Sequence, residues 1–256
     1  MTFQDVIIVW VLIFVRLTVM FSFLPVFRSD NVPMTAKILF SSIFSFVFLS
    51  TGAFKYSPQS FDLVSMLVNI VFEAINGLTL GFAVLLIMNA IYLAGHMIDT
   101  DVGFSMVNVI SPQDESSMPI TANFYYMLML VIFIGINAHH TVIDAFALSL
   151  NKVALGSLGF NVTHLSAFTE LMSLTFVIGF RMAIPVLFTI LVSNLVLGLL
   201  SKAMPGMNVF MIGMPFKILV GLLTLLVILP FTYSFMVSIL ETLADFLYGV
   251  VGRMYL

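Results

Sequence analysis

Two histidines and a nearby aspartate have the residue types and spacing that suggest metal chemistry. His140 and Asp144 are four positions apart, so they share one face of a helix, and His139 precedes them. The sequence has no H-E-x-x-H motif, and a third ligand would have to come from His96 or Asp99, which are distant in sequence. We therefore expect no metal and interpret the three residues as a hydrated cluster at a helix end.

Motifs of other enzyme classes do not occur in this sequence. It contains no G-x-S-x-G nucleophile elbow, no Walker-type phosphate loop and no cysteine. The net charge is −3 and no basic run is present, so the chain offers nucleic acid no cationic surface. We expect neither an enzyme, nor a cofactor, nor nucleic-acid binding.

Polar side chains inside apolar segments are the more informative residues. An unpaired charge inside a bilayer costs about 2.5–3.5 kcal/mol, so each needs a partner or water. One interpretation is a proton or ion pathway, with Glu73 paired to Arg16 or to Arg181. The other is hydrogen bonding between helices or subunits, which is favoured because the ionisable residues are scattered singly. The residues concerned are Arg16, Glu73, Asn76, Asn89, Asn137, Arg181, Asn194 and Glu241.

The composition indicates that these polar residues are positioned by membrane helices. Of the 256 residues, 61% are hydrophobic and 8% are charged, against roughly 25% charged in an average soluble domain. Apolar segments long enough to cross a bilayer of about 30 Å lie near 6–24, 36–54, 61–94, 122–146, 171–200 and 216–247. We predict an all-α integral membrane protein of about six apolar segments in a single domain, 1–256.

Three of these segments are longer than one span. Segment 61–94 is either a hairpin or one projecting helix, and the G-x-x-x-G pair of Gly77 and Gly81 favours close helix packing over a turn. Pro185 and Pro230 lie inside the other two segments, and each removes a backbone donor, so both helices should kink.

Methionines form a second pattern between the last two segments. Met204, Met207, Met211 and Met214 recur at spacings of three, four and three, which on a helix is one stripe. Core packing explains such a stripe, and a deformable pore-lining or partner-docking surface also fits. Pro205, Gly206, Gly213 and Pro215 are expected to break the helix at both ends of the stripe.

The loop between the third and fourth segments, "GFSMVNVISPQDESSMP" at 103–119, combines an apolar start with an acidic, serine-rich turn. Gly103 and Pro112 are candidate bending points. The apolar side chains need a dry environment, whereas Asp114 and Glu115 are expected to stay in water. One interpretation is a connector that rests on its own helices.

The stretch "MPGMNVFMIGMPFKILVGL", 204–222, resembles the signature P-Q-M-N-V-F-x-x-G-x-P-x-K-x-x-x-G-L of the flagellar biosynthetic protein FliR family, the R-type (SctT-like) subunits of type III secretion export gates. The chain departs from the signature at Gly206, where the family often has Gln. The resemblance extends to the segment order, the chain length and the 103–119 loop. The matching positions are Pro205, Met207, Asn208, Val209, Phe210, Gly213, Pro215, Lys217, Gly221 and Leu222.

This resemblance implies a pore-forming subunit of the export gate in the bacterial inner membrane, within the flagellar basal body. In such gates long kinked helical hairpins stack in a helical assembly, much of it raised toward the periplasmic side. The implied partners are P-type (FliP) and Q-type (FliQ) subunits, the B-type switch protein (FlhB), unfolded protein substrates and membrane lipid.

The resemblance also implies that the 103–119 loop plugs the pore. Apolar side chains resist wetting and make no strong bonds that a passing chain would have to break. Two alternatives stay open at this point: a small-solute secondary transporter with a site between the broken helices, and an injectisome export gate. The implied plug residues are Gly103, Phe104, Ser105, Met106, Val107, Asn108, Val109, Ile110 and Pro112.

Overall fold

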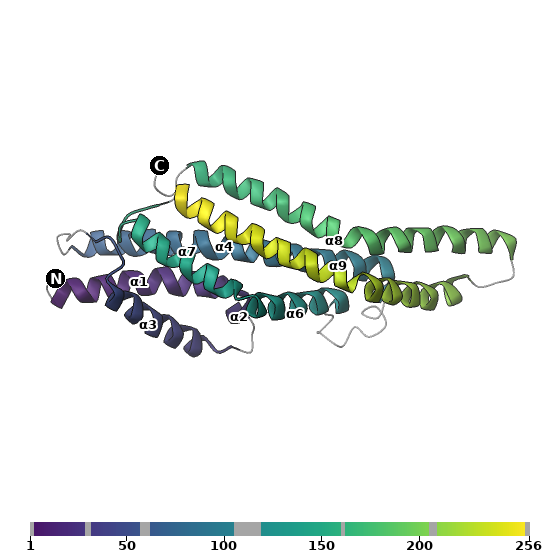
Figure 1. Ribbon diagram of the computed structural model, residues 1–256, viewed down its shortest axis with the longest axis horizontal. Helices are drawn as coiled ribbons and strands as arrows, with labels where there is room; N and C mark the ends of the chain where they lie inside the picture. Colours follow the sequence, from purple (N-terminus) through teal and green to yellow (C-terminus); the bar gives the residue numbers. More distant parts are fainter. Residues whose placement is uncertain are drawn as a thin grey trace. The chain divides into compact units, whose positions relative to one another are not determined.

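The computed structural model describes residues 3–28, 32–56, 62–104, 119–159, 162–204 and 209–253. Within these ranges the regular structure is helical and contains no strand, which confirms the predicted all-α class. Figure 1 shows the order of the helices. They are α1 (Phe3–Phe23), α2 (Pro25–Arg28), α3 (Met34–Thr51), α4 (Leu63–Val102), α6 (Ile120–Gly135), α7 (Ala138–Lys152), α8 (Val162–Ala203) and α9 (Val209–Arg253).

Helix length and apolarity support the predicted number of segments with one correction. Among the described residues, 5 helices can cross a membrane, or up to 6 if α6 and α7 count as one broken span. The predicted segment 122–146 is therefore two helices. Asn137, with a φ of 60°, adopts a left-handed conformation, and its N–H donates to the carbonyl of Ile134 at 3.1 Å. Because that conformation cannot continue a helix, the chain turns between α6 and α7.

The three longest helices exceed the thickness of a bilayer. They contain 40, 42 and 45 residues, which corresponds to about 60–68 Å at the rise of an α-helix. Residues 63–94 of this segment are thus part of one helix, α4, and not a hairpin. Pro185 lies inside α8 and Pro230 inside α9 without ending either helix, and α8 changes direction near the middle of its length (Figure 1).

The chain divides into two compact units, and α4, α6, α8 and α9 each contribute residues to both. Unit 1 contains 1–87, 133–172 and 240–256. In this unit Gly77 and Gly81 of α4 lie against the backbone of α1 at Arg16 and Met20, where a Cβ atom would collide with the backbone oxygens. The close packing predicted from the G-x-x-x-G pair is confirmed. Aromatic rings complete the core, with Phe48 and Phe146 at a centroid distance of 5.1 Å.

Unit 2 contains 88–132 and 173–239. Its core also depends on small residues at helix contacts. Gly95 of α4 lies against the backbone of Ala122 in α6, and Gly221 of α9 lies against Val102 of α4. The buried apolar side chains of this unit include Ile91, Ala94, Ile98, Met129, Ala183, Val186 and Ile190.

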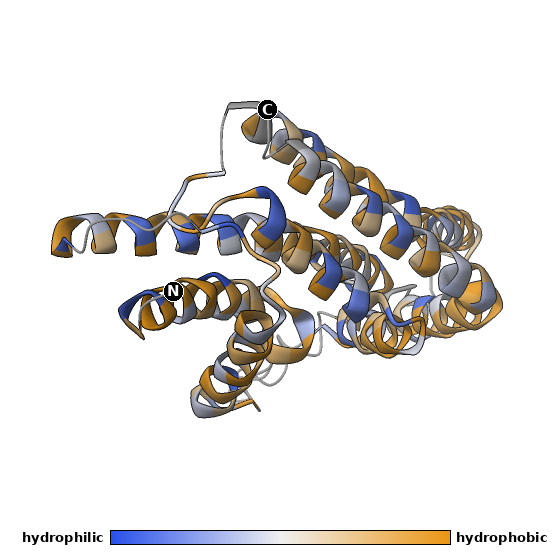
Figure 2. Ribbon diagram, turned by 60° about the vertical axis from the view of Figure 1, so that its left-hand side comes forward, coloured by the Kyte–Doolittle hydropathy of each residue, from blue (hydrophilic) through white to orange (hydrophobic). Residues whose placement is uncertain are grey.

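Much apolar surface remains uncovered in this single chain. Figure 2 shows apolar residues along most of the length of the helices. On α8 the exposed set includes Phe176 at 62%, Phe188 at 64% and Leu199 at 70% of their maximal accessible areas. The fold of one chain therefore leaves long apolar helix faces for lipid or for other proteins.

Candidate functional site

The most highly organised polar site lies in unit 1 around an ion pair between α1 and α4. The guanidinium of Arg16 donates two bonds to the carboxylate of Glu73, one from Nε to Oε2 and one from Nη2 to Oε1 at 3.0 Å. Both side chains are 0% exposed. The pairing is bidentate, which is the strongest geometry for an arginine and a carboxylate. This geometry recovers part of the cost of burying two charges.

Further hydrogen bonds connect this pair to α7. Arg16 Nη1 donates to Ser149 Oγ at 3.3 Å, and Ser149 Oγ donates to the carbonyl of Phe146 at 2.7 Å. Glu73 Oε1 also accepts from the backbone N–H of Gly156 at 2.8 Å, in the turn that follows α7. One ion pair thus connects α1, α4, α7 and the turn after α7.

Asn76, one helical turn after Glu73, binds the same turn through its amide group. Its Nδ2 donates to the carbonyl of Ser157 at 2.9 Å, and its Oδ1 accepts from the N–H of Gly159 at 3.0 Å. The pattern requires Glu73 and Asn76 three residues apart on one helix face. Both side chains are buried, at 0% and 1% exposure.

These contacts favour structural pairing over an ion pathway. An arginine stays protonated at any physiological pH, so it cannot relay protons. Glu73 directs both oxygens into hydrogen bonds with Arg16 and Gly156, and neither member of the ion pair contacts solvent. Arg16 and Arg181 were the two possible partners of Glu73, and in the structure Glu73 binds Arg16. Arg181 is exposed on α8 in unit 2.

A second polar cluster lies in unit 2, where the 103–119 loop begins and ends. The carboxylate of Asp99 in α4 accepts hydrogen bonds from the backbone N–H groups of Thr121 and Ala122 at the start of α6. Gly103, with a φ of 99°, follows the end of α4, and its N–H donates to the carbonyl of Asp99 at 3.2 Å. Of the implied plug residues, Gly103 and Phe104 are described and partly exposed. The others, Ser105, Met106, Val107, Asn108, Val109, Ile110 and Pro112, lie outside the described residues.

Within the signature region, residues 209–222 form the first turns of α9. Gly213, Pro215 and Lys217 all lie inside the helix, so the prediction that Gly213 and Pro215 break it is wrong. Pro215 is the seventh residue of α9 and has no N–H to donate to the carbonyl of Met211, yet the helix continues past this missing bond. Val209 and Phe210 begin α9, whereas Pro205, Met207 and Asn208 lie outside the described residues.

The methionine pattern is not a stripe on one helix. Met204 follows the end of α8, whereas Met211 and Met214 belong to α9. Met211 is 77% exposed. Core packing therefore does not explain Met211, which belongs to the uncovered apolar surface.

The histidine cluster lies on α7. The ring centroids of His139 and His140 are 4.3 Å apart, and Asp144 follows on the same helix and is exposed. Among the described residues no group of three or more metal-ligating side chains comes together.

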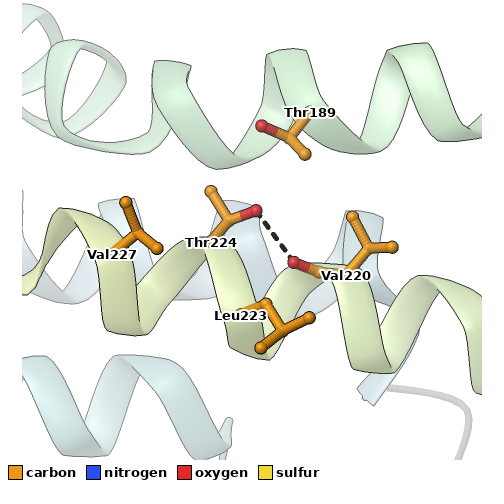
Figure 3. A pocket seen from close by; sticks show the side chains of 5 residues that line it. All are labelled: Thr189, Val220, Leu223, Thr224 and Val227. Carbon is orange, nitrogen blue, oxygen red and sulfur yellow. Dashed lines mark hydrogen bonds between the residues drawn. The ribbon is translucent and has the colours of Figure 1, made fainter.

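A pocket of about 350 Å³ lies between α8 and α9 in unit 2, where a transporter would need its site. Figure 3 shows Thr189 on one helix and the other lining residues, Val220, Leu223, Thr224 and Val227, on the second. The hydroxyl of Thr189 donates to the carbonyl of Pro185, and that of Thr224 donates to the carbonyl of Val220, each at 2.8 Å. Because both hydroxyls already donate within their own helices, they offer a solute acceptor oxygens but no free donor, and the other lining residues are apolar.

Sequence reasoning missed several residues that organise the two clusters. Ser149 and Gly156 were not identified because a serine and a glycine carry no local sign of a distant carboxylate. Asp99 was considered only as a remote metal ligand. Asp99 lies 22 residues before Thr121, so no local capping pattern marks it as the acceptor for the start of α6.

Comparison with known proteins identifies the family. The sequence model of "Bacterial export proteins, family 1" matches residues 7–243. The chain is 30% identical over 222 residues to the flagellar biosynthetic protein FliR of Bacillus subtilis, covering 85% of each chain. It is 25% identical over 240 residues to the Escherichia coli protein of that name, covering 93% of this chain and 91% of the relative. For Aquifex aeolicus FliR the identity is 27% over 232 residues, covering 90% and 88%. With its apolar helices, the chain therefore belongs to the flagellar biosynthetic protein FliR family of bacterial export proteins and is a membrane-embedded component of the flagellar export apparatus.

Proposed function

We propose that this chain is a structural, non-enzymatic subunit of the flagellar export gate in the bacterial inner membrane. It builds a protein-conducting channel together with P-type and Q-type subunits, and the B-type switch protein contacts the assembly. Unfolded protein substrates pass through the channel, and the 103–119 loop closes it when it is idle. The names of the curated relatives are flagellar, which favours a flagellar gate over an injectisome.

The observation that carries this proposal is the uncovered surface of α8 and α9. At 42 and 45 residues, each helix is about twice as long as a bilayer of roughly 30 Å requires. Lipid can cover only part of such a helix, yet apolar residues are exposed from Phe176 on α8 to Leu199, and from Met211 on α9 to Phe231. Partner subunits can cover the apolar residues of these helices that lipid does not reach. Such an assembly would extend above the membrane plane.

Arg181 gives this surface a charge that lipid does not tolerate. It is exposed near the middle of α8, and its neighbours on the same face, Val177 and Ile184, are 40% and 42% exposed. A bare guanidinium in lipid would cost at least about 2.5–3.5 kcal/mol. A carboxylate or carbonyl from a partner subunit would stabilise it instead.

Replacing Arg181 with Gln is expected to weaken subunit association by about 2 kcal/mol or more, because a desolvated acceptor on the partner would lose its charged donor. The measurement is the amount of P-type and Q-type subunits that co-purify with the tagged full-length chain. Lys202→Gln, an exposed position at the end of α8, is the matched control and should leave recovery unchanged. Equal recovery of partners with Arg181→Gln would show that this face docks no subunit through Arg181.

Deleting residues 103–110 is expected to leave assembly intact and to raise ion leakage through the closed complex. The deleted residues supply most of the apolar part of the loop, which resists wetting of the channel. The measurement is ion conductance of the purified complex in a planar bilayer. The control replaces Asp114 and Glu115 with Asn and Gln, which removes charge from the acidic turn and keeps the apolar part. The plug role is refuted if the deletion leaves conductance unchanged.

A further inference from the structure

We propose that one face of α4 in unit 2 forms part of the wall of the aqueous channel and contacts the passing polypeptide. The proposal rests on the gate function proposed above and names the residues that meet the substrate. The face consists of four exposed polar residues, which we name the polar stripe: Asn89, Tyr92, His96 and Thr100.

The polar stripe runs along one side of the helix. Its members are three, four and four positions apart, and at about 100° per residue they fall within an arc of about 80°. The hydroxyl of Thr100 donates to the carbonyl of His96 at 2.9 Å, and its oxygen can still accept a further bond. Between residues 88 and 102 the other residues are buried or half-buried, except Asp101 in the last turn of the helix. The exposed side of this stretch is therefore entirely polar.

Three other helices of unit 2 pack against the remaining sides of the same stretch. A glycine allows close approach in each case: Gly95 of α4 lies against Ala122 of α6, Gly179 of α8 against Ala90 of α4, and Gly221 of α9 against Val102 of α4. The polar stripe is thus the side of α4 that the described residues of unit 2 leave uncovered.

The exposed faces of these three neighbouring helices differ from the polar stripe. Within unit 2 they consist mainly of aliphatic and aromatic side chains, and the exposed Arg181 and Asn194 of α8 are each flanked by apolar residues. Lipid and the apolar faces of other subunits can cover such surfaces. A row of hydrogen-bonding side chains would lose its water there without gaining partners. The exposed apolar residues include Phe124, Met127 and Val131 of α6, Phe176, Phe188 and Leu195 of α8, and Leu219, Val227 and Phe231 of α9.

This distribution of polar and apolar faces is typical of a channel wall. A helical unit that stands free in bulk water is polar on all sides, and a unit surrounded by lipid exposes apolar residues on all sides. Unit 2 combines apolar outer faces on α6, α8 and α9 with a polar face on α4. Such a unit meets lipid or subunits on its apolar faces and water on the polar stripe.

The chemistry of the polar stripe fits an unfolded polypeptide as the passing substrate. Every extended chain presents backbone N–H and C=O groups, whatever its sequence. Asparagine, tyrosine and threonine donate and accept hydrogen bonds without a fixed charge. Their bonds to a passing backbone can exchange with bonds to water, and they do not select substrates by charge.

Photo-crosslinking at three aromatic positions tests the contact with substrate. A benzophenone amino acid replaces Tyr92 in the full-length chain or, as matched controls, Phe124 of α6 or Phe188 of α8, all exposed in unit 2. The probe is a flagellar export substrate fused to a stably folded protein, which halts in the channel. Tyr92 should give at least roughly tenfold more crosslinked substrate than either control, because the polar stripe lines the conduit. Absence of substrate crosslinks at Tyr92, or equal crosslinks at all three positions, would overturn the proposal.

Thiol labelling tests independently whether the polar stripe meets water. The chain has no cysteine, so His96→Cys and Thr100→Cys can be compared with Met127→Cys on α6 and Leu195→Cys on α8, all at exposed positions. A membrane-impermeant thiol reagent is added to both sides of membranes that contain the assembled complex. Because the thiolate is the reactive form and water stabilises it, the two stripe positions should react at least roughly tenfold faster than the two controls. Equal rates at all four positions would contradict a water-facing stripe.

The outcomes separate this proposal from the gate function on which it rests. Rapid labelling without substrate crosslinks would mean that the polar stripe meets water outside the channel, and the channel-wall assignment would be wrong. Co-purification of the P-type and Q-type subunits would still support the gate in that case. If the unmodified chain does not recover those subunits, the gate function fails and the channel-wall assignment fails with it.

Discussion

Replacing Glu73 with alanine is expected to prevent the chain from accumulating as a folded protein. The guanidinium of Arg16 would stay buried at 0% exposure without its carboxylate, and the N–H of Gly156 would lose its acceptor. Breaking a buried ion pair by removing one partner costs about 3–5 kcal/mol. That is a large share of the roughly 5–15 kcal/mol by which a typical domain is stable.

The measurement is the amount of full-length chain in membranes, together with its thermal unfolding midpoint in detergent. Glu170→Ala is the control, because Glu170 is exposed on α8. Wild-type levels of Glu73→Ala with an unchanged midpoint would show that the pair contributes nothing to stability.

The double variant Arg16→Met with Glu73→Leu separates structural pairing from an ion pathway. Replacing both charges by apolar side chains of similar volume leaves no charge unpaired, so it should recover much of the stability lost in Glu73→Ala. If the pair is structural, this variant should also support assembly and export. Normal assembly without export would instead favour the pathway interpretation.

Replacing Gly77 with alanine is expected to force α1 and α4 apart. The added Cβ would coincide with the backbone of Arg16, which cannot move like a flexible side chain. Overpacking of this kind costs about 1–3 kcal/mol, and the separation would also strain the bond between Arg16 and Glu73. The expected result is a lower unfolding midpoint and less chain in membranes.

Gly198→Ala is the matched control for this substitution. Gly198 lies in α8, and a Cβ atom there meets nothing within 4 Å. Alanine is favoured over glycine in a helix by roughly 1 kcal/mol, so this variant should be neutral or slightly more stable. An equal effect of the two substitutions would contradict a specific contact between α1 and α4 at Gly77.

Several structural features could be predicted from short sequence patterns because interactions between residues close in sequence determine them. The G-x-x-x-G pair indicated close packing of a single helix, and α4 is one helix that packs there. The wrong predictions are those in which a rule for one residue type was applied without the rest of the helix. Pro215 and Gly213 were expected to end a helix, yet α9 begins at Val209 and continues through both. The break at Asn137 was not predicted, because a left-handed asparagine in an apolar segment has no periodic signal.

The sequence by itself determined the class of protein and its family. Apolar segments longer than a bilayer require helices, and charges within such segments require partners, since neither backbone groups nor charges are stable alone in lipid. What only the tertiary structure decided is which groups meet. Glu73 binds Arg16 across 57 residues, and Asp99 caps α6 across 22. Such pairings depend on the register and distance between helices, which side-chain packing sets and which the periodicity of one helix does not contain.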